Sequence, residues 1–232
     1  MRTTAILLAC LQLLRFLSTS TAHGVPPASN PYEFGPDKRP DPSTVGYNIN
    51  HVGFVVSNIT ATLYFYTQLI GMTHMWTYHA TSTYSISCVG HGAGGRNGTG
   101  YQTPLELTNQ KNNMQGLLEF IYISPKATNP PPQKPIPSTA KSHSFSHIGL
   151  MVPDIRATQR RMKSAGVKII KEVGVDNPLT GAMPQAYGLG LLPPGNEKLV
   201  EEAVKGFEAS GSTAFLFVED PDGNLIEIQS QW

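Results

Sequence analysis

The sequence predicts an α+β fold built from two βαβββ modules, and three observations lead to this prediction. A short segment recurs at an offset of 96 residues, each copy is followed by similar apolar periods, and a proline-rich stretch separates the copies. A repeat of this kind indicates a duplicated structural unit. We therefore expect a first module at residues 47–124, a connector at 125–142 and a second module at 143–232.

The repeat gives the first strand and the helix of each module. Residues 51–62 read HVGFVVSNITAT and residues 147–158 read HIGLMVPDIRAT, with six of twelve positions identical. The first six residues of each copy are apolar apart from a histidine and a glycine two positions later, which share one face of a strand. A helical apolar period follows at once, with Asn58 and Asp154 as expected N-caps and Gly71 and Gly166 as expected stops.

Three further strand-like stretches follow each helix. Alternating or continuous apolar residues over short lengths favour strands, particularly where turn residues bound them. The predicted strands are 73–77, 83–89 and 117–124 in the first module, and 168–173, 214–219 and 225–230 in the second.

Two long excursions and one stiff connector complete the modules. Residues 91–116 are glycine-rich, and residues 176–213 form an insertion with an expected amphipathic helix at 197–209. Loops this long are either functional lids or plain surface insertions. Six prolines between residues 124 and 141 predict an extended connector, because proline cannot donate to a sheet ladder.

Composition excludes two broad classes of protein. Of the 232 residues 40% are hydrophobic and 14% charged, and the formal net charge is +1. Such a chain is too apolar to be disordered and too neutral for a broad basic surface, so we expect no nucleic-acid partner.

The N-terminal segment predicts export. Arg2 precedes an apolar run at residues 5–14, and small residues end at Ala22, which is typical of a signal peptide at residues 1–22. The run is too short to span a bilayer, so we expect a secreted protein, or one of the secretory pathway, with no membrane anchor. Residues 23–46 read as a proline-rich lead-in. Sequons at Asn58 and Asn97 fit a glycoprotein.

Four ionisable residues occupy predicted strands whose other residues are mostly apolar: His51, Glu119, His147 and Glu227. A carboxylate in a buried strand is costly unless it is paired or bound to a cation. Glu227 alternatively faces water, because Gln229 follows it on the same face. If the modules pack about an approximate two-fold axis, all four residues converge on one point. Two imidazoles and two carboxylates suit Zn, Ni, Co, Mn or Fe as a divalent ion, with positions left for water or substrate.

The sequence resembles the vicinal oxygen chelate superfamily, which includes glyoxalase I, bleomycin resistance proteins and extradiol dioxygenases. The resemblance lies in HVGFVV at 51–56, SHIGL at 146–150 and EDPDGNLIEI at 219–228, and it covers about residues 47–232 without the two excursions. It implies two βαβββ modules whose open mixed sheets form a cup, with His51, Glu119, His147 and Glu227 as metal ligands. Glu106, in PLELT, superficially matches a family motif, but it lies 41 residues from His147, whereas Glu119 lies 28 residues away and fits the family spacing.

The resemblance also implies a reaction. The divalent metal would polarise a carbonyl group of a small organic substrate, such as a secondary metabolite, while Glu227 or Glu119 moves a proton, which is isomerase, epimerase or lyase chemistry. Glyoxalase I holds the carboxylates of glutathione with an arginine and an asparagine. Those positions here are Val55 and, by the same alignment, Ile123, so we expect a substrate other than glutathione. Both modules lie in one chain, and a homodimer is also compatible with the family.

Two alternatives stay open at this point. The first is an Fe or Mn extradiol-type dioxygenase in which only His51, His147 and Glu227 bind the metal. The second is a non-catalytic protein that binds a small molecule in the cup, because fold alone does not fix function.

Overall fold

The computed structural model describes residues 32–94, 100–140 and 144–231. The chain divides into two compact units, residues 1–48 and residues 49–232. The predicted signal peptide and the sequon residue Asn97 lie outside the described residues. In the first unit the described part holds one 3-10 turn, Pro42–Thr44, whose first backbone groups are capped by Asp41.

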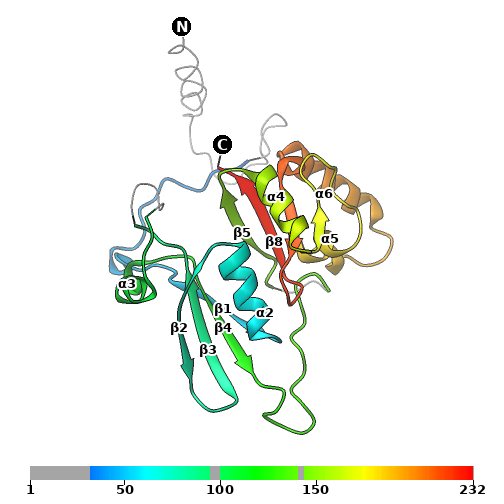
Figure 1. The fold of residues 1–232 in the computed structure, drawn as a ribbon. Helices are drawn as coiled ribbons and strands as arrows, with labels where there is room; N and C mark the ends of the chain where they lie inside the picture. The colour runs from blue at the N-terminus through cyan, green and yellow to red at the C-terminus, as the bar shows by residue number, and fades with distance from the viewer. Residues whose placement is uncertain (1–31, 95–99, 141–143, 232) are drawn as a thin grey trace. The chain divides into compact units, whose positions relative to one another are not determined.

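The second unit contains two four-stranded mixed sheets with the same topology (Figure 1). The first sheet has the order β1-β4-β3-β2 and the second has the order β5-β8-β7-β6; only the β1–β4 and β5–β8 pairs are parallel. The strands are β1 (His51–Val56), β2 (Thr73–His79), β3 (Tyr84–Gly90), β4 (Leu117–Ile123), β5 (His147–Val152), β6 (Ile169–Lys171), β7 (Leu216–Glu219) and β8 (Leu225–Ser230). This arrangement confirms the α+β fold of two βαβββ modules.

Each module has a helix between its first two strands. In the second module this is α4 (Ile155–Ser164), and in the first it is α2 (Ile59–Tyr64), which continues as a π-helical turn at Phe65–Leu69. Asn58 and Asp154 each accept the backbone N–H three residues on, so both predicted N-caps are confirmed.

The two helices contribute to one apolar core that crosses the module boundary. Val56, Phe65 and Phe120 of the first module belong to the same buried cluster as Met162 and Ile226 of the second. Because burial of apolar surface drives folding, this shared cluster joins the modules into one unit.

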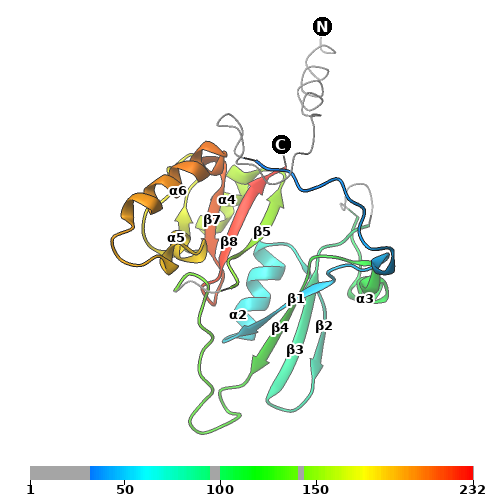
Figure 2. The same ribbon diagram turned by 180° about the vertical axis from the view of Figure 1, so that it is seen from behind.

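On the opposite face of each sheet, helices of an excursion pack against part of the strands (Figure 2). In the first module α3 (Pro104–Gln110) packs Leu107 against Met75 and Cys88. In the second module α5 (Ala182–Ala186) packs Met183 against Phe217, next to α6 (Glu197–Ala209). The sequence predicted α6 at the observed residues but missed α3, although Thr103 and Glu106 form a capping box with a proline at the first helical position.

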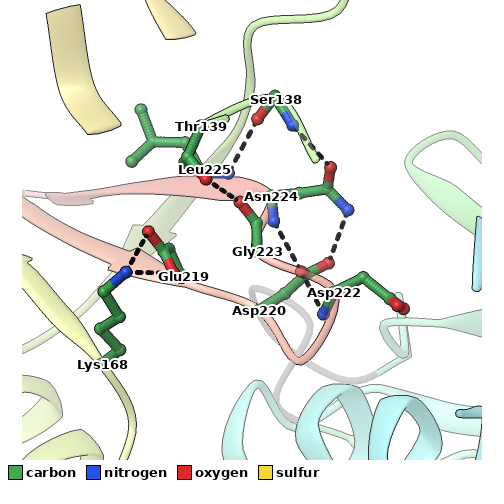
Figure 3. A network of polar contacts seen from close by, with 9 residues as sticks. All are labelled: Ser138, Thr139, Lys168, Glu219, Asp220, Asp222, Gly223, Asn224 and Leu225. Carbon is green, nitrogen blue, oxygen red and sulfur yellow. Dashed lines mark hydrogen bonds and ion pairs between the residues drawn. The ribbon is translucent and has the colours of Figure 1, made fainter. Parts of the chain in front are cut away.

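Figure 3 shows how the β7–β8 turn is held against the connector. The Asp220 carboxylate accepts the backbone N–H groups of Asp222 and Asn224 at 2.9 and 2.8 Å, while Asn224 Oδ1 accepts the backbone N–H of Ser138. The turn residue Gly223 has a φ of +89°, and a Cβ there would lie 3.0 Å from the Pro137 side chain. The EDPDGN segment therefore has a structural role at this turn.

Candidate functional site

The two modules carry the same strand register at their histidine–glutamate pairs. Gly53 of β1 lies opposite Glu119 of β4, and Gly149 of β5 lies opposite Glu227 of β8. Each histidine therefore lies diagonally across from its glutamate on the same face of the sheet. The residue directly opposite each glutamate is a glycine, which has no side chain. A Cβ built on either glycine would meet no atom within 4 Å, so open space adjoins both pairs.

The distances within the two pairs are nearly equal. His51 Nε2 lies 3.5 Å from Glu119 Oε2, and His147 Nε2 lies 3.6 Å from Glu227 Oε2. The pairs differ in exposure, because Glu227 is buried whereas His51 is exposed and Glu119 is partly buried. The interpretation that Glu227 faces water is therefore wrong, because the insertion covers its face of the sheet.

The hydrogen bonds around Asn50 determine which nitrogen of His51 carries the hydrogen. Asn50 Nδ2 donates to the backbone carbonyls of Lys111 and Met114 at 2.6 and 3.0 Å, so its Oδ1 faces His51 Nδ1 at 3.1 Å. An amide oxygen can only accept, so Nδ1 of His51 is the donor. In the neutral ring, Nε2 is then an acceptor that faces the carboxylate acceptor of Glu119. A metal ion placed between these two atoms would find an acceptor on each side.

In the second module, the insertion adds a tyrosine to the pair. The ring of Tyr187, directly after α5, stacks on His147 with centroids 4.9 Å apart and an interplanar angle of 18°. Its hydroxyl donates to Glu227 Oε2, and Gln229 Nε2 donates to the other oxygen of the same carboxylate. Burial and the Glu227 carboxylate raise the pKa of Tyr187, so this hydroxyl stays protonated.

The sequence did not single out Tyr187. Tyr187 lies in the insertion at residues 176–213, and the first module has no equivalent insertion. A comparison of the two copies of the repeat therefore cannot identify this tyrosine. The one possible signal was the length of the insertion itself, because long loops often contribute to sites.

The structure brings the four predicted ligands together as two pairs and not as one quartet. Among the described residues, no group of three or more His, Cys, Asp or Glu side chains is close enough to hold a metal ion. The four predicted ligands therefore do not converge on one point in this structure, contrary to the expectation from the sequence. The physical reason is that β1 and β5 are edge strands of separate sheets and do not pair with each other.

A cavity of about 350 Å³ lies between these two edge strands. Both His51 and His147 line it, together with Phe54 and Leu118 of the first module and Leu150 of the second. The two histidines therefore share one cavity, although their carboxylate partners belong to different sheets.

Glu106 and the thiol of Cys88 do not contribute to either His–Glu pair. Glu106 is exposed, and its carboxylate accepts the backbone N–H and the hydroxyl of Thr103 at the start of α3. Cys88 is buried beside Met75, and burial together with the nearby Glu119 raises the pKa of its thiol to about 11. Cys88 therefore remains a protonated thiol at neutral pH and is no nucleophile.

The comparison with known protein families identifies the family of this chain. The family model described as Glyoxalase/Bleomycin resistance protein/Dioxygenase superfamily matches residues 48–177, which is more than half of the sequence. The chain belongs to this superfamily. The matched part of this glyoxalase-superfamily protein contains three of the four predicted ligands, and Glu227 lies beyond it.

Solved structures of several glyoxalases are similar to this superfamily member. Glyoxalase I of Leishmania major, described as trypanothione-dependent, shares 17% identity with a TM-score of 0.47, covering 80% of this chain and 87% of that chain. A variant of glyoxalase I from Zea mays shares 18% identity with a TM-score of 0.46, covering 78% of this chain and 44% of that chain. No curated protein sequence matches this chain.

The donor atoms of this superfamily member fit a divalent metal within each pair. Nitrogen and oxygen ligands about 2.1 Å from a tetrahedral ion lie about 3.4 Å apart, close to the separations in both pairs. Nδ1 of His51 and of His147 lies within hydrogen-bond distance of Asn50 and Ser146, at 3.1 and 2.8 Å, and such contacts orient metal-binding imidazoles. The spacing between the pairs does not fit one shared ion unless the β1 and β5 edges approach each other.

Proposed function

We propose that this protein is a metal-dependent enzyme of the glyoxalase type, an isomerase, epimerase or lyase that moves a proton next to a carbonyl group. The observation that carries the proposal is the duplicated His–Glu pair, because an acceptor nitrogen of His51 faces an acceptor oxygen of Glu119 and a metal ion satisfies both. Membership of the superfamily supports it, since the family includes enzymes of this type.

His51 with Glu119, and His147 with Glu227, would each hold a divalent ion as a pair, with Zn, Ni, Co, Mn and Fe as candidates from the donor set. Such an ion polarises a carbonyl oxygen and so makes the neighbouring C–H group more acidic. Glu227 receives hydrogen bonds from Tyr187 and Gln229, which hold its carboxylate in place. In the described part of the chain, the one polar contact recorded for the Glu119 carboxylate is with His51. Glu119 is therefore the carboxylate that is free to move and accept the proton.

The glutathione-binding positions of glyoxalase I have no charged counterpart here. Val55 and Ile123 have aliphatic side chains without a donor or a charge, so neither can pair with a carboxylate group. This supports a small organic substrate other than glutathione.

Metal analysis tests the proposal without knowledge of the substrate. We expect the purified protein to retain divalent metal after dialysis, measured by elemental mass spectrometry. Glu119→Gln and Glu227→Gln should each weaken metal binding at least tenfold, because each removes an anionic ligand. Glu106→Gln is the matched control, since that exposed carboxylate caps α3 away from both pairs. A protein that binds no divalent ion, or Gln variants that bind like the control, would contradict the proposal.

A second candidate function is non-catalytic binding of a small molecule. The apolar cavity between β1 and β5 favours it, because a cavity can bind a ligand without turning it over. Stoichiometric binding by a protein that takes up no metal would establish this second function in place of the first.

A further inference from the structure

The cavity between β1 and β5 has a chemistry that selects its ligand. We propose that it binds an uncharged, largely apolar carbonyl compound of about single-ring size, with the apolar body between the two sheets and the oxygen toward His51 and His147. The placement of the oxygen rests on the proposed function, whereas the binding of the apolar body does not.

The walls of the cavity come from both modules and are mostly aliphatic or aromatic. Its lining contains no Asp, Glu, Lys or Arg residue. In the metal-free protein, a carboxylate or phosphate group would lose its hydration there without gaining an ionic partner, which weakens its binding. The apolar lining residues are Ile49, Val52, Phe54, Ile70, Met72, Leu117, Leu118, Phe145, Ile148, Leu150 and Ile226.

The polar groups of the lining are few, and two of them are already engaged. Tyr66 donates its hydroxyl to Asp220 at 3.1 Å, and both amide hydrogens of Asn50 are taken by backbone carbonyls. The remaining polar side chains are imidazoles, His51, His91 and His147. A ligand therefore finds its polar contacts at the histidines and apolar contacts elsewhere. This is the pattern of a small-molecule site, in which a few polar groups fix the orientation.

The volume limits the size of the ligand. Pockets for drug-sized molecules usually measure about 300 to 1,000 Å³, and this cavity of about 350 Å³ lies at the lower end of that range. A single aromatic ring with a short acyl group fits such a volume.

The duplicated glycines provide a matched pair of variants. Gly149 lines the cavity, and Gly53, its equivalent in the first module, is not among the lining residues. Neither glycine has a positive φ, and neither would place a Cβ within 4 Å of another atom. Gly149→Leu should therefore fill part of the cavity while the fold is retained, and Gly53→Leu should add the same side chain outside it.

The experiment uses acetophenone as the neutral probe and benzoate as its charged counterpart, with binding followed by ligand-observed NMR on the metal-free full chain. We expect acetophenone to bind at least tenfold more tightly than benzoate. Gly149→Leu should weaken acetophenone binding at least tenfold, and Gly53→Leu should change it less than twofold. Circular dichroism checks the fold of both variants, and Gly149→Ala replaces Gly149→Leu if the larger side chain prevents folding.

Equal binding of the two probes, or unchanged binding in the folded Gly149 variants, would overturn the inference. The metal analysis described above is independent of this result. If no metal binds but acetophenone binding responds to Gly149 as expected, the ligand site is supported and the proposed enzyme is contradicted. If metal binds but the Gly149 variants leave acetophenone binding unchanged, the proposed enzyme is supported and this ligand class is contradicted.

Discussion

Tyr187 makes the two otherwise similar His–Glu pairs unequal. It stacks on His147 and donates its hydroxyl to Glu227, whereas α3 of the first module contributes Leu107 to the apolar cluster at the equivalent face. A buried carboxylate depends on its donors, because water cannot replace them. The ring also contacts Phe207 and Phe217, which fixes the direction in which the hydroxyl points.

Removing this hydroxyl tests its contribution. Tyr187→Phe keeps the ring contacts but leaves Glu227 Oε2 without its tyrosine donor, so we expect the free energy of unfolding to fall by about 1–3 kcal/mol. Tyr64→Phe is the control, because Tyr64 is 57% exposed. Both values come from guanidinium unfolding curves at neutral pH. Equal effects of the two substitutions would show that the hydroxyl of Tyr187 does not stabilise the buried carboxylate.

At the residue scale, the sequence could predict the pairs but not their surroundings. His51 and His147 stand out because they occupy equivalent repeat positions, and Glu119 and Glu227 because they interrupt apolar strands. Tyr187 belongs to an insertion without a repeat partner, so its placement depends on tertiary packing that no local pattern encodes.

The largest of the described excursions, between β6 and β7, is closed at its base by Lys171. This buried side chain lies on β6, and its Nζ donates to the backbone carbonyls of Val175, Ser212 and Thr213 at 3.1, 3.0 and 3.0 Å. Val175 directly precedes the insertion and the other two end it. One ammonium group thus joins the two ends of the segment that carries α5, α6 and Tyr187.

Substitution of Lys171 tests this role. Lys171→Met has a similar shape but leaves three backbone carbonyls, that of the buried Ser212 among them, without their donor, so we expect the free energy of unfolding to fall by about 3 kcal/mol. Lys168→Met is the matched control, because that neighbouring lysine is 68% exposed and pairs with Glu219 at the surface. Its effect should stay below about 1 kcal/mol. Similar losses in the two variants, measured by guanidinium unfolding, would contradict the role of Lys171.

At the element scale, the strand and cap predictions follow from local chemistry and are largely confirmed. The predicted strand at 168–173 is observed only at Ile169–Lys171, where the β6–β7 pairing is irregular. The predicted helix at 59–70 changes to a π-helical turn at Phe65, where Ile70 N–H bonds to Phe65 O. The buried residues Thr62, Phe65, Tyr66 and Leu69 nevertheless keep the spacing of one helical face through this turn.

The whole molecule depends on a core shared between the modules. Besides the common buried cluster, Tyr66 of the first module donates to Asp220 of the second, and the backbone N–H of Ser57 donates to Asp222. Neither module can lose its fold without exposing apolar surface of the other. The sequence predicted both modules but not the separation of their His–Glu pairs, because the distance between two sheets depends on packing at their edges.

This shared core predicts a single cooperative unfolding transition. Trp76 lies on β2 of the first module, and the longest described helix, α6, lies in the second. In a Trp232→Phe variant, fluorescence reports on Trp76 alone, because the chain has two tryptophans. We expect its denaturant midpoint to coincide with that of far-ultraviolet circular dichroism. A fluorescence transition that clearly precedes the loss of helix would show that the modules unfold separately.

The presence of Tyr187 in only one half has a consequence for the orientation of a bound ligand. A duplicated fold with two interchangeable halves would accept a ligand in either of two orientations related by a half turn. Here one end of the ligand faces a pair that a phenol covers, and the other end faces a pair without it. The two orientations therefore differ in energy, and the protein can hold an unsymmetrical ligand in one of them.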